Sequence, residues 1–245
     1  AYRAQGNFPQ AIADYNKAIE INPKLAGAYM NRGVAYGQQN NLSQAISDLT
    51  RAIEINPKLA EAYGNRGVAY DHQGNFPQAI ADYNKAIEIN PKLAGAYMNR
   101  GVAYDHQGNF PQAIADYNKA IEINPKLAEA YMNRGVAYGQ QNNLSQAIAD
   151  YNKAIEINPK LAEAYMNRGV AYGQQNNLSQ AISDLTRAIE INPSYAQAHY
   201  NRGVVYSATK DYDKAWNDVH KAGELGYKAD PAFLDRLKKA SGRDK

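Results

Sequence analysis

The sequence predicts an all-α fold, an α-solenoid in which antiparallel helix pairs stack one after another. The first observation is a period of 34 residues: the tripeptide Ile-Asn-Pro recurs with its prolines at Pro23, Pro57, Pro91, Pro125, Pro159 and Pro193. The second is that each period contains two stretches with apolar residues at helical spacing. Two short amphipathic helices cannot bury their apolar faces alone, so neighbouring pairs are expected to stack.

Counting the repeats from Ala26 gives six complete units and one partial unit. The complete units span residues 26–59, 60–93, 94–127, 128–161, 162–195 and 196–229, and the partial unit spans residues 1–25. In unit 94–127 the first stretch, which we name helix A, contains Ala96, Tyr97, Gly101, Ala103 and Tyr104. The second, helix B, contains Ala113, Ile114, Tyr117, Ala120, Ile121 and Ile123.

Turn and breaker residues separate these helices. Gly108-Asn109 follows helix A, and Pro111 can occupy the first turn of helix B. Asn124-Pro125 should end helix B, because proline disfavours a helical conformation in the residue before it. The residues equivalent to Gly108 in other units are Asn40, Asn142 and Asn176. Asparagine is the commonest substitute for glycine in a left-handed turn, so the turn should be preserved.

The repeated positions resemble those of a known family. Tyr97, Gly101, Tyr104, Ala113, Tyr117, Ala120 and Pro125 match the signature of the tetratricopeptide repeat, and the resemblance covers residues 1–229. It implies a right-handed superhelix whose A helices line a concave face. Small residues such as Gly101, Ala113 and Ala120 would allow the helices to approach closely.

The last unit departs from the pattern, as expected at the end of an array. Trp216 and Gly223 replace isoleucines, and Tyr227 replaces the proline. Asp230-Pro231 then indicates a new helix, with Phe233, Leu234 and Leu237 forming an apolar stripe. We expect a capping helix and tail over residues 230–245, and a single solenoid over residues 1–245.

Composition excludes several classes of protein. The chain has no Cys, and no stretch approaches the roughly 20 apolar residues of a membrane span. A net charge of +3 over 245 residues is too small to indicate a nucleic-acid-binding protein. No catalytic arrangement stands apart from the repeats, so we expect no enzyme activity, cofactor, membrane or nucleic-acid partner. The compartment is not defined.

One asparagine per unit recurs on the expected groove side of helix A. These residues are Asn31, Asn65, Asn99, Asn133, Asn167 and Asn201, and they resemble the asparagine ladder with which some family members hold an extended peptide. An amide can accept from a peptide N–H and donate to a peptide C=O. The function expected is therefore a protein-interaction scaffold that binds an extended segment in the groove. The alternative for these residues is that each one bonds a neighbouring helix or water.

A set of apolar residues flanks the asparagines. It comprises Met30, Met98, Met132, Met166 and Tyr200, with Val34, Val68, Val102, Val136, Val170 and Val204 one turn further on. Exposed, these residues would form an adaptable floor for a ligand. Their alternative role is packing between adjacent A helices. The family's carboxylate clamp, which binds an acidic chain terminus, is not supported, because only its Asn component is present.

Two charged series recur at fixed positions. One is Arg32, Arg66, Arg100, Arg134, Arg168 and Arg202 on helix A, and the other is Asp14, Asp48, Asp82, Asp116, Asp150, Asp184 and Asp218 on helix B. We expect them to form a repeated ion-pair seam rather than present arginines to an anionic ligand. Asp71-His72 and Asp105-His106 could suggest a metal site, but we interpret them as a solvated groove rim, without a metal.

A second function, self-association through the ends of the array, also remains open. The chain begins at Ala1-Tyr2, in the middle of a helix A motif, which indicates a fragment. Part of the cover over Ile12, Tyr15 and Ile19 would then be missing, and another copy is expected to contact this surface.

Overall fold

The computed structural model describes residues 7–243, and in this part of the chain short turns connect α-helices. The helices are α1 (Phe8–Ile21), α2 (Ala26–Gln38), α3 (Leu42–Ile55), α4 (Ala60–His72), α5 (Phe76–Ile89), α6 (Ala94–His106), α7 (Phe110–Ile123), α8 (Ala128–Gln140), α9 (Leu144–Ile157), α10 (Ala162–Gln174), α11 (Leu178–Ile191), α12 (Ala196–Ala208), α13 (Tyr212–Glu224) and α14 (Pro231–Ser241). No strand occurs among the described residues. None of these helices has the length and apolar content of a membrane span.

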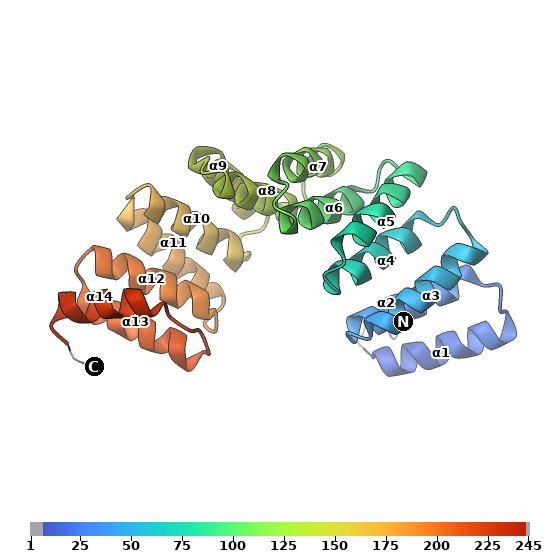
Figure 1. Cartoon of the computed structure of the whole chain (residues 1–245), viewed down its shortest axis with the longest axis horizontal. Helices are drawn as coiled ribbons and strands as arrows, with labels where there is room; N and C mark the ends of the chain where they lie inside the picture. Colours follow the sequence, from blue (N-terminus) through green and yellow to red (C-terminus); the bar gives the residue numbers. More distant parts are fainter. Residues whose placement is uncertain (1–6, 244–245) are drawn as a thin grey trace. The chain divides into compact units, whose positions relative to one another are not determined.

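The predicted helix pairs are confirmed. Helices α2, α4, α6, α8, α10 and α12 are the A helices, and each begins at the alanine that opens a unit. Each packs mainly against the B helix that follows it. The chain divides into two compact units, Ala1–Pro125 and Lys126–Lys245. Within each unit, successive helix pairs stack as an all-α solenoid (Figure 1). The prediction of one solenoid domain over residues 1–245 stays a prediction.

Turn and cap residues act as the sequence indicates. Asn40, Asn142 and Asn176 have φ angles of 60°, 58° and 62°, close to the 72° of Gly108. The turn therefore keeps its left-handed residue when glycine is replaced. Helix α7 begins with Pro111 in its first turn and ends at Ile123, and Asn124 is its extended C-cap.

The interior of each helix pair is built from small residues against large ones. A Cβ atom added at Gly101 would lie 2.7 Å from Cε1 of Tyr117. Tyr117, Ala113 and Ala120 are fully buried. Glycine is thus required at this position because the tyrosine ring of helix B packs directly on the backbone of helix A.

The expected seam of Arg–Asp pairs is present in both compact halves of the chain, Ala1–Pro125 and Lys126–Lys245. Arg66 donates to Asp82 from Nε and Nη2, at 2.7 and 2.8 Å, and its Nη1 donates to Thr50 on the preceding B helix at 3.0 Å. The same two-oxygen contact joins Arg32 to Asp48, Arg100 to Asp116, Arg134 to Asp150, Arg168 to Asp184 and Arg202 to Asp218. The pairs are mostly buried, and they fix the height of one helix against the next.

The predicted capping helix is also confirmed. Helix α14 starts after Asp230, whose side chain accepts a hydrogen bond from the Ala232 N–H. Its apolar residues Phe233 and Leu237 are buried, 6% and 0% exposed, in a cluster with Trp216 of α13. The cap therefore covers the apolar face that the last pair would otherwise expose.

Candidate functional site

The six asparagines lie half-buried on the A helices, at the same place in each repeat. Within residues 7–243, the side chains of Asn65, Asn99, Asn133 and Asn167 make no hydrogen bond to protein. Asn201 donates to the buried sulfur of Met166, at 3.4 Å. Most of these amides are thus not held by a neighbouring helix. Their donors and acceptors are available to an outside partner or to water.

The apolar set beside them divides into two groups. Met30, Met98 and all six valines are partly exposed. Met132 and Met166 are only 6% and 5% exposed and belong to core clusters of the C-terminal unit. These two methionines therefore pack between helices and do not form part of a ligand floor, because their long side chains reach inward to fill the core.

Tyr200 also differs from the expectation. Its ring lies 4.8 Å from the Tyr227 ring and 5.6 Å from the Phe233 ring, between centroids. It therefore packs under the capping segment. A bulky ring at this position is explained by the cap that follows it, because α14 needs an apolar surface on α12 to cover.

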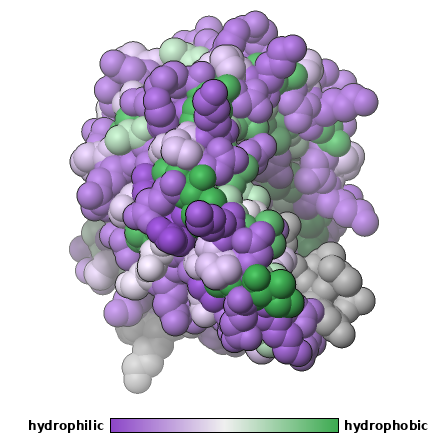
Figure 2. All heavy atoms as spheres, turned by 90° about the vertical axis from the view of Figure 1, so that its right-hand side faces the viewer, coloured by the Kyte–Doolittle hydropathy of each residue, from purple (hydrophilic) through white to green (hydrophobic). Residues whose placement is uncertain are grey.

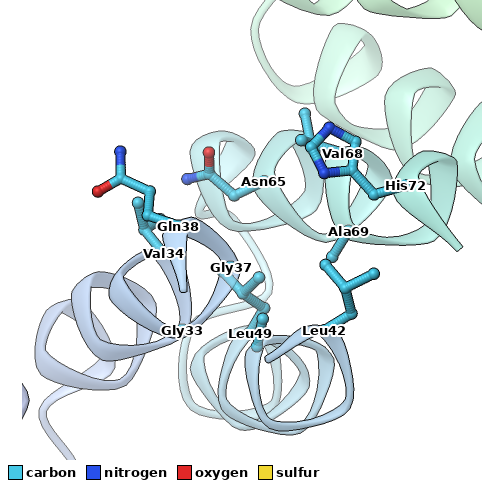
Figure 3. A pocket seen from close by; sticks show the side chains of 11 residues that line it. Gly33, Val34, Gly37, Gln38, Leu42, Leu49, Asn65, Val68, Ala69 and His72 are labelled. Atoms are coloured by element: carbon cyan, nitrogen blue, oxygen red, sulfur yellow. The ribbon is translucent and has the colours of Figure 1, made fainter. Parts of the chain in front are cut away.

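Hollows open between neighbouring A helices, beside the asparagines. The first, of about 250 Å³, is lined by Val34, Gly37 and Gln38 of α2, Leu42 and Leu49 of α3, and Asn65, Val68 and His72 of α4. Figure 3 shows Leu42 and Leu49 pointing into it from α3, with the Gln38 and Asn65 amides on its open side. It is an apolar depression with amide groups at its rim.

Two further hollows, both within residues 126–245, lie at the same place in their repeats, and the smaller of them is lined mainly by polar surface. One, of about 180 Å³, involves Val136, Gly139, Leu144 and Asn167. The other, of about 240 Å³, involves Val170, Gly173, Leu178 and Asn201. Each hollow thus combines a valine and a glycine of one A helix, the first leucine of its B helix and the asparagine of the next A helix.

The charge on the A helices is acidic once pairing is considered. Their only basic residues besides histidine are the six arginines, which are bound to the Asp series on the B helices. Hydrogen bonding to Asp116 raises the pKa of Arg100 further above its ordinary value. Glu61, Glu129 and Glu163 are exposed near the helix N-termini. Helices α2, α4, α6, α8, α10 and α12 consequently offer no free arginine or lysine for an anionic ligand.

Asp71 and Asp105 are not the solvated rim that the sequence suggested. Each has a buried Oδ1 atom without a hydrogen-bond partner. Asp105 accepts from the Tyr117 hydroxyl at 2.6 Å, and burial raises the pKa of both carboxyls. Phe76 stacks on His106, with 4.9 Å between ring centroids. The two carboxyls lie partly inside the repeat, whereas His72 and His106 are exposed. No group able to hold a metal ion is found among the described residues.

The hollows are a feature that the sequence pattern did not predict. Their signal was a glycine near the end of helix A, at Gly37, Gly139 and Gly173, where other units have Asp71, Asp105 and Ser207. Glycines were expected only where helices pack closely or where the chain turns, and these three serve neither purpose.

Comparisons with known proteins agree with this architecture. Models described as tetratricopeptide repeat match residues 26–59, 60–93, 94–127, 128–161, 162–195 and 185–217, and a model described as TPR repeat matches residues 1–40. No significant match was found among the curated proteins.

Several solved structures share the fold. The APC/C hetero-tetramer Cut9-Hcn1 contains a chain that is 20% identical with a TM-score of 0.83; the match covers 98% of this chain and 47% of that one. A tetratricopeptide repeat protein from Parabacteroides merdae ATCC 43184 is 22% identical, with a TM-score of 0.72. The match covers 99% of this chain and 95% of that one. YrrB, described as a TPR protein with an unusual peptide-binding site, is 26% identical, with a TM-score of 0.59. The match covers 75% of this chain and 95% of that one. This chain therefore spans about half the length of the first of these relatives.

Proposed function

The chain belongs to the tetratricopeptide repeat family, whose fold is generally a non-catalytic scaffold for protein interaction, and we propose that it binds an extended polypeptide segment along its A helices. The observation that carries this proposal is the series of asparagines whose amides have no hydrogen-bond partner at four positions within residues 7–243. The unusual peptide-binding site described for YrrB is consistent with the same use of the fold.

The asparagines would hold the main chain of the ligand. Each amide offers one acceptor and two donors, which match the N–H and C=O groups of an extended segment whose own groups are unpaired. A neutral hydrogen bond contributes about 0.5–1.5 kcal/mol, so several repeats must act together to give useful affinity. Binding of this kind depends weakly on ligand sequence, and side-chain contacts must supply the selectivity.

The test begins with peptides selected on the intact chain from a displayed random library. Their affinities are measured by fluorescence anisotropy for the parent and for the triple variant Asn99→Ala, Asn133→Ala, Asn167→Ala. We expect binding to fall by at least about tenfold, since roughly three amide contacts are removed. Methylation of single ligand backbone nitrogens should also weaken binding at the positions that an asparagine contacts.

The matched control replaces three regularly spaced residues on the B helices. Lys85, Lys119 and Lys153 form exposed ion pairs with Glu88, Glu122 and Glu156. Replacing these lysines together by alanine should leave peptide affinity within about twofold of the parent. Equal peptide binding by the asparagine variant and the parent, with helicity unchanged, would refute the proposal.

Self-association is a second candidate function, and one observation favours it. At the N-terminal end of the described chain, Ile21 is 86% exposed and Leu25 is 42% exposed, and no other large apolar residue described is as open. Figure 2 shows apolar residues in patches on this side of a mainly hydrophilic surface. Because α14 covers the C-terminal end, an association through the ends would pair two N-terminal ends. Ile12, Tyr15 and Ile19, the residues that were expected to lack part of their cover, are partly exposed, and Ala1 and Tyr2 lie outside the described residues.

A further inference from the structure

In two repeats, a tyrosine of helix B lies close to an aspartate near the end of helix A. The Tyr117 hydroxyl donates to the Asp105 carboxylate at 2.6 Å. In the preceding repeat, burial and then the charge of Asp71 raise the pKa of Tyr83, so these two side chains also lie near each other. A hydroxyl inside the protein needs such an acceptor, because a buried polar group without a hydrogen bond costs free energy.

These two positions match each other in all but one of the five repeats between residues 26 and 195. Where helix A has aspartate, helix B has tyrosine, as in the two pairs above. Where helix A has glycine, helix B has Leu49 or Leu185, and Leu49 points into the first hollow (Figure 3). The fourth repeat instead combines Gly139 with Tyr151. Its tyrosine therefore faces no carboxyl group from helix A.

Tyr151 is nevertheless placed like the other two tyrosines. It is 4% exposed, and its ring packs on the backbone of Gly135, where an added Cβ would lie 2.7 Å from Cε1. Its hydroxyl lies 3.8 Å from the position of an added Gly139 Cβ, and it has no hydrogen-bond partner within residues 7–243. The only fully buried side-chain atoms without a partner in this range are oxygen atoms of Asp71 and Asp105. The Tyr151 hydroxyl is thus a donor that remains open to a ligand.

The hollow in front of this hydroxyl is polar and carries no charge. Tyr151 lines it together with the amides of Gln140, Asn167 and Gln174, and its volume is about 180 Å³. Its surface is mainly polar, and no charged side chain of the described residues lines it. Burial raises the pKa of Tyr151, so the hydroxyl stays protonated and can donate at neutral pH.

A neutral acceptor suits this hollow better than a carboxylate. Behind the effect of burial, the charges of Asp150 and Glu163 also raise the pKa of Tyr151, so the surroundings are already negative. Burial raises the pKa of Asp105, which shows that a carboxylate loses hydration at the equivalent place. A carboxamide has the shape of a carboxyl group without its charge, and it adds two donors that the amide oxygen atoms of the wall can bind.

We propose that the hollow at Gly139 receives the side-chain amide of one glutamine or asparagine of the bound polypeptide. The C=O group of that amide accepts from the Tyr151 hydroxyl, as the Asp105 carboxylate accepts from the tyrosine of its own repeat, and the NH₂ group donates to the wall of the hollow. This inference rests on the proposed function and deepens it by naming a side chain of the ligand. It supplies selectivity, which contacts to the ligand main chain do not.

The test uses the full chain and peptides selected on it from a displayed random library. We expect the selected peptides to share a glutamine or asparagine at one aligned position. In one such peptide, this residue is changed to glutamate, alanine or leucine, and the affinities of the fluorescent peptides are measured by anisotropy at pH 7. Each change should weaken binding by about three- to tenfold, because the hydrogen bond to Tyr151 is lost or a charge is buried.

Variants of the chain then locate the contact. Tyr151→Phe keeps the ring that packs on Gly135 and removes only the hydroxyl, so the advantage of glutamine over alanine should fall below about twofold. Gly139→Asp fills the hollow with the residue that already stands beside Tyr117, and it should have the same effect. The matched control is Tyr117→Phe. Its hydroxyl is bound to Asp105, so its loss should leave the advantage of glutamine intact.

The outcomes separate this inference from the proposed function. Asn99 and Asn133 do not line this hollow, so their double replacement by alanine tests the main-chain contacts alone. If that variant loses binding but the peptides show no preference for glutamine or asparagine, or keep it with Tyr151→Phe, the inference is wrong and the proposed function stands. Tighter binding of the glutamate peptide would also overturn the inference, because the ligand group would then be a carboxylate. If peptide affinity is unaffected by the asparagine variant, the proposed function fails.

Discussion

Arg100 and Asp116 form a two-pronged ion pair within one repeat. Nε of Arg100 lies 2.7 Å from Oδ2 of Asp116 and Nη2 lies 2.6 Å from Oδ1, while Nη1 donates to Asn84 on the preceding B helix at 2.5 Å. The Arg100 side chain is 18% exposed and the Asp116 side chain 9% exposed. One guanidinium thus joins three helices, which explains why an arginine recurs at this position in every complete repeat.

Removing one partner of this pair should be costly. Asp116→Ala leaves the guanidinium of Arg100 largely buried without its carboxylate, and we expect the free energy of unfolding to fall by roughly 3 kcal/mol. Urea denaturation followed by circular dichroism measures this change. The control is Glu122→Ala, which removes an exposed pair with Lys119 and should cost less than about 0.5 kcal/mol. Equal effects of the two substitutions would show that the seam behaves as ordinary surface charge.

The different surroundings of Gly101 and Gly173 predict opposite effects of one substitution. Gly101→Ala forces a methyl group to within 2.7 Å of the Tyr117 ring and should destabilise the chain by about 1–3 kcal/mol. Gly173→Ala meets only ordinary contacts and should stabilise it by up to about 1 kcal/mol. Thermal and urea unfolding of the two variants measure whether each substitution lowers or raises the stability of the chain. A destabilised Gly173→Ala variant would mean that packing, and not an open hollow, requires this glycine.

Asp105 gives a dependence on pH whose direction follows from its burial. Desolvation raises its pKa in the folded chain above the ordinary value of 3.8, despite the opposing hydrogen bond from Tyr117. Between the unfolded and the raised folded pKa, the folded chain binds more protons, so the free energy of unfolding falls as pH rises through this window. Asp105→Asn removes the charge and keeps an acceptor for Tyr117.

We expect Asp105→Asn to be more stable than the parent at pH 7, and this advantage to disappear as pH falls through the window toward pH 3.8. Melting temperatures of both proteins over a series of pH values measure the difference. The exposed acid Glu163, changed to Gln, controls for net charge and should shift stability little at any pH. A constant difference between Asp105→Asn and the parent at all pH values would contradict the burial argument.

The sequence predicted the features that depend on local chemistry and period. Pro125, Asn124 and Gly108 define helix ends and turns through backbone restrictions alone, so their effect is the same in every repeat. The Arg66–Asp82 seam was also predictable, because antiparallel helices bring fixed positions to the same height. In contrast, the inward turn of Met132 and the position of Tyr200 under α14 depend on how neighbouring side chains fill the interior, and period carries no such information.

The hollows were missed for a related reason. A hollow is defined by what is absent from several helices at once, and Gly173 shows its role only when Leu178 and Asn201 surround it. A comparison of Gly173 with Asp71 and Asp105 in the aligned units was the available signal. The partners of the asparagines could likewise not be read from a repeat pattern, since amides at a constant period suit both packing and binding.

The exposed end of α1 yields the last prediction. Ile21 is 86% exposed, whereas its equivalent Ile55 in the next repeat is partly buried. Burial of apolar area contributes about 25 cal/mol per Å², so a small patch gives weak association only. If self-association uses this end, sedimentation velocity should show dimers at high protein concentration, and Ile21→Lys should remove them without lowering the melting temperature.

Leu237→Ala at the capped end is the informative comparison: the residue is fully buried, so its loss should lower the free energy of unfolding by roughly 3 kcal/mol. It should also expose apolar surface beside Trp216 and create a new, heterogeneous association. A parent that sediments as a monomer at every concentration, with Ile21→Lys identical to it, would leave peptide binding as the only function that the surface supports.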